Sequence, residues 1–442
     1  MKPTWRLGAA ALVIACWLSA AGAPLVDAVR GLRQPADFVR DYVAARARLE
    51  DGRGPPLDGE AGNRRALAYG APAVGLYGGP YFIHPPPATT AVLPLARLPW
   101  RAAALAWAGL SLIALGWLAR SLVGIWRPDR PPAAIPAALL TLALALWPPT
   151  LHCLEKGQWS IWLAALLAAG LRSFEAGRPQ RAGIAFGVAA ALKATPVVLL
   201  GFLLLRRRRA AVALLLTAGL AALIALVVVG PDAWRAFLAE SPHNAAVWAP
   251  WIANTASLDG VYARLLTSNP FSRALLVAPR LAATAFGLTE LALLAAAIGA
   301  TLPIRRHRAG TPASESRLLA AWLTLPVLLN PLGWSHVVLM LLAPLAVLAR
   351  DGGTRHRTIA IVLLALLSIP RQRLAAWAGP LPVGPAGTVL LGLHALVGVA
   401  LFVTLCWPSQ TPTDDGVGDV GNASRQRDAA AAFSSGAQSA EI

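Results

Sequence analysis

Residues 182–205 read A-G-I-A-F-G-V-A-A-A-L-K-A-T-P-V-V-L-L-G-F-L-L-L and stand between two basic clusters, Arg178/Arg181 and Arg206–Arg209. Short basic clusters between apolar runs are typical of cytoplasmic loops, so both ends of this stretch are expected on the cytoplasmic side of a membrane. At a rise of about 1.5 Å per residue, the stretch is too short for two full spans. We therefore expect two half-helices that meet inside the membrane, broken by Pro196, with Lys193 near the apex.

The composition of the whole chain agrees with a membrane location. The 442 residues are 57% hydrophobic and only 14% charged, whereas an average soluble domain has roughly 25% charged residues. The repeated apolar runs have the length of bilayer-spanning helices. The sequence therefore predicts an all-α polytopic membrane protein with about ten to twelve membrane segments. The net charge of +18 comes largely from Arg clusters that set orientation, and it does not indicate a nucleic-acid partner.

The basic clusters also predict the topology. We expect an uncleaved first helix at 7–26 with a cytoplasmic N-terminus, although its A-G-A also resembles a signal-peptide cleavage site. Further segments are expected at about 101–125, 133–151, 159–175, 210–229, 274–303, 317–349 (a hairpin), 358–371 and 386–407. Two large external loops, about 27–98 and 230–273, follow from this order. Residues 1–407 then form one membrane domain, and 408–442 form a disordered tail on the cytoplasmic side.

Two acidic residues stand out in the first external loop, within A-D-F-V-R-D-Y-V-A-A at 36–45. Asp37 and Asp41 are four residues apart, so on a helix they share a face. One interpretation is a solvated helix start with Asp37 as its N-cap. The other is a carboxylate that acts as a general base at the boundary between membrane and exterior.

Lysine is rare in this chain and occurs only at positions 2, 156 and 193. An ammonium group inside a bilayer costs roughly 2.5–3.5 kcal/mol, so Lys193 is expected to have an anionic partner. That partner is either the phosphate of a lipid ligand or a carboxylate of the protein itself. Lys156 and Gln158 lie in E-K-G-Q at 155–158, which is either an ordinary outer turn or the wall of a polar pocket.

Three histidines, His84, His243 and His336, fall on the same expected outer side. Each is either a structural residue or a ligand-binding one. They have no acidic neighbours at regular spacing, so no metal site is predicted. The cysteines, Cys16, Cys153 and Cys406, are far apart in apolar segments and indicate no disulfide framework.

Four stretches together resemble glycosyltransferase family 87, integral-membrane enzymes of the GT-C class that use polyprenyl-phosphate sugars, typically mannose. They are A-D-F-V-R-D-Y-V-A-A-R-A-R-L (36–49), Y-F-I-H-P-P-P-A-T-T-A-V-L-P-L-A-R-L-P (81–99), E-K-G-Q-W-S-I-W through L-K-A-T-P-V-V-L-L (155–200), and N-T-A-S-L-D-G (254–260) with L-L-N-P-L-G-W-S-H (328–336). Three departures from the family pattern are present. Trp159 stands where the family usually has Asn, Asp41 replaces an aromatic residue, and an extra residue stands between Asn254 and Ser257, where the family often has Asn-Gln-Ser.

The resemblance implies a GT-C-type helix bundle in a bacterial inner membrane, with both termini cytoplasmic and the active site on the periplasmic or outer face. It implies an inverting transfer of a hexose, mannose being the expected sugar, from a polyprenyl phosphate to a lipid or glycan acceptor, without metal or other cofactor. Asp37 matches the family's catalytic base. The expected substrate-binding residues are Lys193, His336, Lys156, Gln158, His84, His243 and Asn254. The alternative is a transporter or flippase of lipid-linked glycans, which would need a continuous polar path through the membrane.

Overall fold

The structure is a computed structural model that describes residues 22, 24–31, 35–52, 59–73, 84–302, 312–351 and 353–407. Over these residues the regular secondary structure is helical, apart from one isolated bridge between Ser272 and Val383. The described residues up to Cys406 belong to one compact unit. The helix expected at 7–26 lies mostly outside the described residues, and the tail expected at 408–442 lies wholly outside them.

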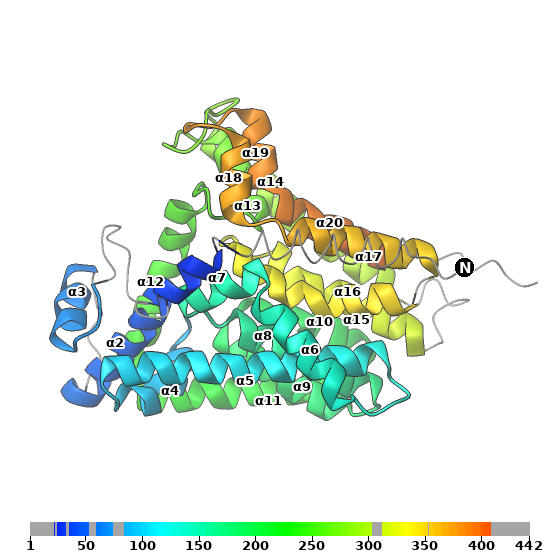
Figure 1. Cartoon of the computed structure of the whole chain (residues 1–442), viewed down its shortest axis with the longest axis horizontal. Helices are drawn as coiled ribbons and strands as arrows, with labels where there is room; N and C mark the ends of the chain where they lie inside the picture. The colour runs from blue at the N-terminus through cyan, green and yellow to red at the C-terminus, as the bar shows by residue number, and fades with distance from the viewer. Residues whose placement is uncertain are drawn as a thin grey trace, which may run out of the picture. The chain divides into compact units, whose positions relative to one another are not determined.

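Helices follow one another closely along this unit (Figure 1). In chain order they are α2 (Ala36–Asp51), α3 (Gly59–Ala68), α4 (Pro86–Ala96), α5 (Trp100–Trp126), α6 (Ala134–Ala145), α7 (Pro148–Lys156), α8 (Ser160–Glu175), α9 (Pro179–Leu192), η1 (Thr195–Val198), α10 (Leu199–Arg206), α11 (Arg208–Val228), α12 (Pro231–Trp248), α13 (Leu258–Leu266), α14 (Pro279–Thr301), α15 (Pro312–Leu328), η3 (Ser335–Leu341), α16 (Leu342–Asp351), α17 (Thr354–Leu367), α18 (Arg371–Ala378), α19 (Pro385–Leu391) and α20 (Leu393–Cys406).

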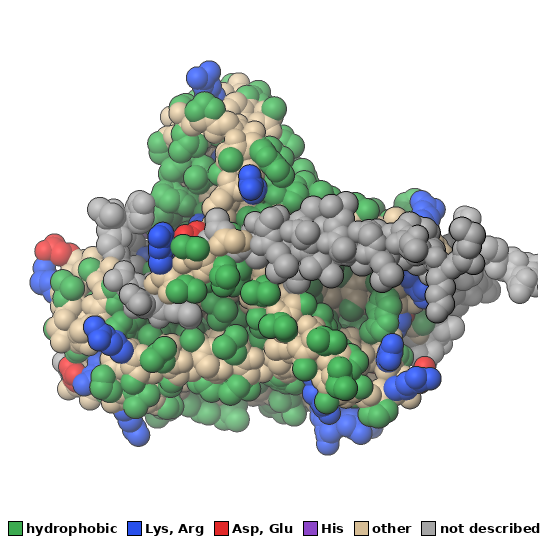
Figure 2. Space-filling model, viewed as in Figure 1, with side chains coloured by type: hydrophobic (Ala, Val, Ile, Leu, Met, Phe, Trp, Pro, Cys, Tyr) green, Lys and Arg blue, Asp and Glu red, His purple; other side chains and the backbone are tan. Residues whose placement is uncertain are grey.

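Several helices are suited to a bilayer. Among the described residues, α5, α11 and α14 are long and apolar enough to cross a membrane, and the bent pairs α6–α7, α17–α18 and α19–α20 raise the number to as many as six. Helices such as α8 and α9, with 16 and 14 residues, are shorter than a full span. Figure 2 shows hydrophobic side chains over much of the exposed surface, with Lys and Arg gathered toward its edges. The chain is an all-α polytopic membrane protein.

Helix α8 lies at the centre of the bundle. Most of its residues are buried, and it packs against α5, α9, α15, α16 and η3. Its sequence explains this position, because small and branched apolar residues occur all around the helix, as expected for a helix with no exposed face. The start of α8 is therefore held in the interior, and residues just before it can be placed precisely against other elements.

The expected break within 182–205 is present. Helix α9 ends at Leu192, and Lys193 follows in extended conformation with φ −151° and ψ 123°. A short 3-10 helix that contains Pro196 then leads into α10. The missing amide hydrogen of proline and its fixed φ angle account for the change from α-helix to 3-10 helix. Lys193 therefore lies at the helix break itself, next to backbone groups that are not part of an α-helix.

Glycine allows α9 and α11 to approach closely. A Cβ atom at Gly183 would clash with the carbonyl oxygen of Ala210, and one at Gly187 would lie 2.7 Å from that of Leu214. The two glycines are four residues apart on one face of α9. This is the small-residue spacing that lets membrane helices pack backbone to backbone.

A valine at Gly183 should therefore separate the two helices and destabilise the protein by about 2 kcal/mol, as overpacking does elsewhere. Thermal unfolding of purified Gly183→Val in detergent would measure the effect. Gly219→Val on α11 is the matched control, because Gly219 has nothing within 4 Å of its added Cβ position. Equal melting temperatures for the two variants would contradict the role given to Gly183.

Candidate functional site

A cavity of about 630 Å³ collects most of the residues predicted from the sequence. Six of the eight line it: Asp37, His84, Lys156, Gln158, Lys193 and His336. They come from α2, the residues before α4, the end of α7, the α7–α8 turn, the break after α9, and η3. Aromatic residues Phe237, Trp248, Trp251 and Trp334 line it as well. Residues that are far apart in the sequence thus form one polar and aromatic chamber.

A chain of hydrogen bonds joins the two acidic residues of α2 through the cavity wall. The Gln158 side-chain amide donates to Asp37 Oδ2 at 2.5 Å, and its Oε1 lies 3.4 Å from His84 Nε2. His84 Nδ1 lies 3.0 Å from Asp41 Oδ2, and the indole of Trp159 donates to the same oxygen at 2.9 Å. Both contacts of His84 are satisfied together when both ring nitrogens carry a proton.

The two acidic residues differ in their surroundings. Asp37 is half-buried and lines the cavity, whereas the side chain of Asp41 is 4% exposed and is held by His84 and Trp159. Asp37 lies in the first turn of α2, and the N-cap position belongs to Pro35. The interpretation of Asp37 as N-cap is therefore wrong. The shared helix face is confirmed, because both carboxylates contact the α7–α8 turn.

Gly157 brings that turn against α2. It ends α7 with φ +68°, a left-handed conformation that favours glycine. A Cβ atom at this position would lie 2.6 Å from Phe38 Cβ and 2.8 Å from Pro35 Cβ. The close approach is further stabilised by Trp107, whose ring stacks on Phe38 at 5.0 Å and whose indole donates to the Gly157 carbonyl at 3.1 Å. Gln158 and Trp159 follow Gly157 directly, and their side chains donate hydrogen bonds to Asp37 and Asp41 of α2.

Lys193 contributes a positive charge from the break after α9. None of the described carboxylates forms an ion pair with it, although the charge of Asp37 is near enough to influence it. Both residues line the same cavity. The internal ion pair considered for Lys193 is therefore absent among the described residues, and its charge faces the cavity.

His336 is buried in the cavity wall, and only one of its two ring nitrogens has a hydrogen-bond partner among the described residues. Its Nδ1 is hydrogen-bonded to Ser160 Oγ at 2.8 Å, and His152 Nδ1 makes a similar contact with Ser335 Oγ at 2.6 Å. The two imidazole rings are 5.2 Å apart. Nε2 of His336 has no hydrogen-bond partner among the described residues. Because His336 lines the cavity, a bound ligand is the natural partner for this nitrogen.

Two predicted residues lie elsewhere. His243 is exposed on α12, and its neighbour Asn244 is the residue that lines the cavity. Asn254 is buried, and its amide donates to the carbonyls of Ala249 at 2.9 Å and Pro331 at 3.0 Å. Asn254 thus ties the loop after α12 to the N-P-L-G segment that carries Asn330 and Leu332.

Sequence analysis missed two cationic residues of the cavity, Arg40 and Arg371. Arg371 begins α18 and donates to both carboxylate oxygens of Glu155 at 3.2 Å, while Lys156 pairs with the same Glu155 at 2.9 Å. One signal was available. Arg371 stands at the expected outer end of an apolar segment, where the positive-inside rule predicts few basic residues.

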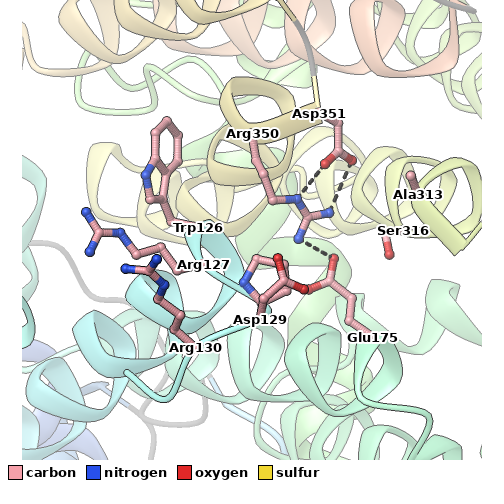
Figure 3. A pocket seen from close by; sticks show the side chains of 10 residues that line it. Trp126, Arg127, Asp129, Arg130, Glu175, Ala313, Ser316, Arg350 and Asp351 are labelled. Carbon is pink, nitrogen blue, oxygen red and sulfur yellow. Dashed lines mark hydrogen bonds and ion pairs between the residues drawn. The ribbon is translucent and has the colours of Figure 1, made fainter. Parts of the chain in front are cut away.

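Other polar features do not compete with this site. The described residues contain no group of three or more His, Cys, Asp or Glu side chains that could hold a metal ion. A second cavity of about 680 Å³ lies at the expected cytoplasmic ends of α5, α8 and α16 (Figure 3). There Arg350 is already paired with Glu175 at 2.9 Å and with Asp351 at 2.5 Å. That cavity contains none of the residues predicted from the sequence.

The fold and the cavity define a multi-pass membrane protein with a polar chamber of acidic and basic groups. The sequence model of glycosyltransferase family 87 matches residues 82–313, just over half of the chain, and the chain belongs to this family. It is a glycosyltransferase by this membership. No curated protein and no solved structure matches the chain. The matched residues include Lys193 and Gln158 but neither Asp37 nor His336, so these last two are placed at the site by geometry alone.

Loss of the Asp41 charge should destabilise the fold. In Asp41→Asn, an amide group would face the donors of His84 and Trp159, and leaving a buried donor unpaired costs about 2 kcal/mol. Glu50→Gln is the matched control on the same helix, since its ion pair with Arg46 is largely exposed and worth little. The measurement is the melting temperature of both variants in detergent. An Asp41→Asn protein as stable as the control would contradict a structural role for the contact between Asp41 and His84.

Proposed function

We propose that this family 87 protein transfers a hexose, with mannose as the expected sugar, from a polyprenyl phosphate to a hydroxyl group of a lipid or glycan acceptor. We place the reaction at the outer face of a bacterial inner membrane, with the N- and C-termini in the cytoplasm. The observation that carries the proposal is the single cavity that presents the Asp37 carboxylate and the Lys193 ammonium from two different elements. Membership of a glycosyltransferase family favours this function over that of a transporter or flippase.

Asp37 is the proposed general base. It removes the proton from the acceptor hydroxyl as that oxygen attacks the anomeric carbon of the sugar. The bond between the anomeric carbon and the phosphate oxygen breaks, and the polyprenyl phosphate leaves with the electron pair, so the configuration inverts. The hydrogen bond from Gln158 fixes the position of the carboxylate, and Asp41 and His84 support Gln158 from behind.

Lys193 is the proposed partner of the leaving phosphate. Negative charge builds up on the phosphate as the bond to the sugar breaks, and a cation held in place at that point stabilises the transition state more than the ground state. The position of Lys193 in a helix break supports this role, because the surrounding backbone is held by the protein and needs no rearrangement. The aromatic residues Trp248, Trp251 and Trp334 offer faces on which a sugar ring or a prenyl chain can pack.

The Asp37→Asn variant should lose transfer activity by about a thousandfold, because removal of a general base typically costs 10²–10⁴-fold in rate. Its stability should be retained, since asparagine still accepts the hydrogen bond from Gln158. The measurement is transfer of label from radiolabelled polyprenyl-phosphate mannose to lipid or glycan in membranes that contain the variant. Asp232→Asn, an exposed acidic residue of α12, is the matched control. Activity of Asp37→Asn within tenfold of that control would exclude Asp37 as the base.

Two substitutions at Lys193 test whether its positive charge is what the transfer reaction requires. Lys193→Ala should lower the transfer rate by about a hundredfold, the order of loss seen when one stabilising donor is removed from a transition state. Lys193→Arg keeps the positive charge and should retain much more activity than the alanine variant. The same labelled-mannose assay compares them, with melting temperatures to establish that both fold. Equal activities of the two variants would count against the phosphate role.

A further inference from the structure

The chain of hydrogen bonds behind Asp37 contains one group whose orientation is not fixed by its shape. Gln158 is 8% exposed, and its backbone is held by Cys153, whose carbonyl accepts from the Gln158 backbone amide at 3.0 Å and whose Sγ donates to the Gln158 carbonyl at 3.3 Å. The side-chain amide can still exchange the places of its oxygen and nitrogen, because the two atoms are nearly the same size. The hydrogen-bond partners of this amide therefore decide which atom faces Asp37.

In the structure the amide nitrogen faces Asp37. Gln158 Nε2 donates to Asp37 Oδ2 at 2.5 Å, and Gln158 Oε1 lies 3.4 Å from His84 Nε2. This orientation requires a proton on His84 Nε2. Without that proton the ring nitrogen is an acceptor, and the amide would turn its own nitrogen toward His84. The amide oxygen would then face the Asp37 carboxylate, and the carboxylate would lose its donor.

Asp41 determines which nitrogen of His84 loses a proton. Both carboxylate oxygens of Asp41 lie close to His84 Nδ1, at 3.1 and 3.0 Å, and Oδ2 also accepts from the indole of Trp159. An ionised carboxylate only accepts hydrogen bonds, so Nδ1 keeps its proton. When the imidazole becomes neutral, the proton that leaves is therefore the one on Nε2, which is the nitrogen next to Gln158.

We propose that His84 is a positioning residue, whose Nε2 proton acts through the Gln158 amide to hold the Asp37 carboxylate in place as the base. The inference rests on the proposed function, because it takes Asp37 to be the base. His84 acts through Gln158 and needs no contact with the substrate. The protonated ring supports transfer and the neutral ring does not, so the transfer rate falls as the pH rises through the titration of His84. The ionisation of Asp37 itself limits the rate on the acidic side.

Other titratable groups must be separated from this effect. Besides the two carboxylates of α2, the cavity is lined by Arg40, Lys156, Lys193, His336 and Arg371. Of these, His336 on η3 is near enough to His84 for the charge of His84 to act on it. Titration of His336 or Lys193 would also change the rate with pH, but that change would not depend on the Gln158 amide. Substitutions at positions 84 and 158 therefore distinguish the two origins.

The test measures kcat and KM for transfer from radiolabelled polyprenyl-phosphate mannose by the full chain in lipid nanodiscs. The pH runs from about 5 to about 9, which includes the range in which histidine changes charge. Gln158→Met keeps the length of the side chain without its amide. His84→Asn keeps a donor for Asp41 but is too short for Gln158, whereas His84→Gln offers Gln158 a donor that does not titrate. Gln180→Met, at an exposed position of α9, is the matched control, and melting temperatures establish that each variant folds.

We expect Gln158→Met and His84→Asn to lower kcat by about tenfold, the loss that follows removal of one charged hydrogen bond, with little change in KM. Both variants should lose the fall in rate at alkaline pH. His84→Gln should also lose this fall but should keep more activity than His84→Asn. The double variant Gln158→Met/His84→Asn should be no slower than the slower single variant, because both changes interrupt the same chain.

Two results would overturn the role of His84. One is an alkaline fall that persists in Gln158→Met or His84→Asn, which would assign it to another group of the cavity. The other is a double variant whose loss equals the product of the two single losses. Failure of the proposed function has a different signature, because Asp37→Asn would then stay active whatever the variants at 84 and 158 do.

Discussion

The structure of the site depends on one buried carboxylate, Asp41. A charged group taken out of water is costly unless it is paired and hydrogen-bonded, and Asp41 obtains its partners from two distant parts of the chain, His84 and Trp159. These bonds hold α2 against the α7–α8 turn, where Gly157 permits the contact. With α2 held in this way, Asp37 lines the cavity and accepts a hydrogen bond from Gln158.

Two departures from the family pattern meet at this point. The resemblance to family 87 leads us to expect Asn at position 159 and an aromatic residue at position 41. In this chain the indole of Trp159 donates to the carboxylate of Asp41. An aromatic residue at position 41 would offer no charged acceptor to the indole of Trp159. An Asn at position 159 has a shorter side chain than Trp and would reach less far toward position 41. The two departures are therefore physically coupled, and Asp41 belongs to the support of the site and not to its cavity surface.

Much of the fold could be predicted from the sequence because the bilayer imposes length and charge rules that act locally. The break at Lys193 followed from basic clusters on both sides of one short apolar stretch, and the helices at 101–125 and 210–229 followed from apolar length. The partners of Asp41 could not be predicted in this way, since His84 and Trp159 are 43 and 118 residues away. Arg371 was missed for the same reason: its place in the cavity depends on a bend between α17 and α18 that no local pattern specifies.

The distribution of charge in the cavity then follows from what the membrane permits. Most basic residues of this chain stand in short clusters between apolar runs, where they cost little if they remain in water. Lys193, Lys156 and Arg371 line the cavity, where each needs an anion. Glu155 satisfies part of this need and Asp37 faces the rest across the chamber. A ligand that brings its own negative charge would complete the balance, and this supports the proposed phosphate-bearing substrate over a neutral sugar alone.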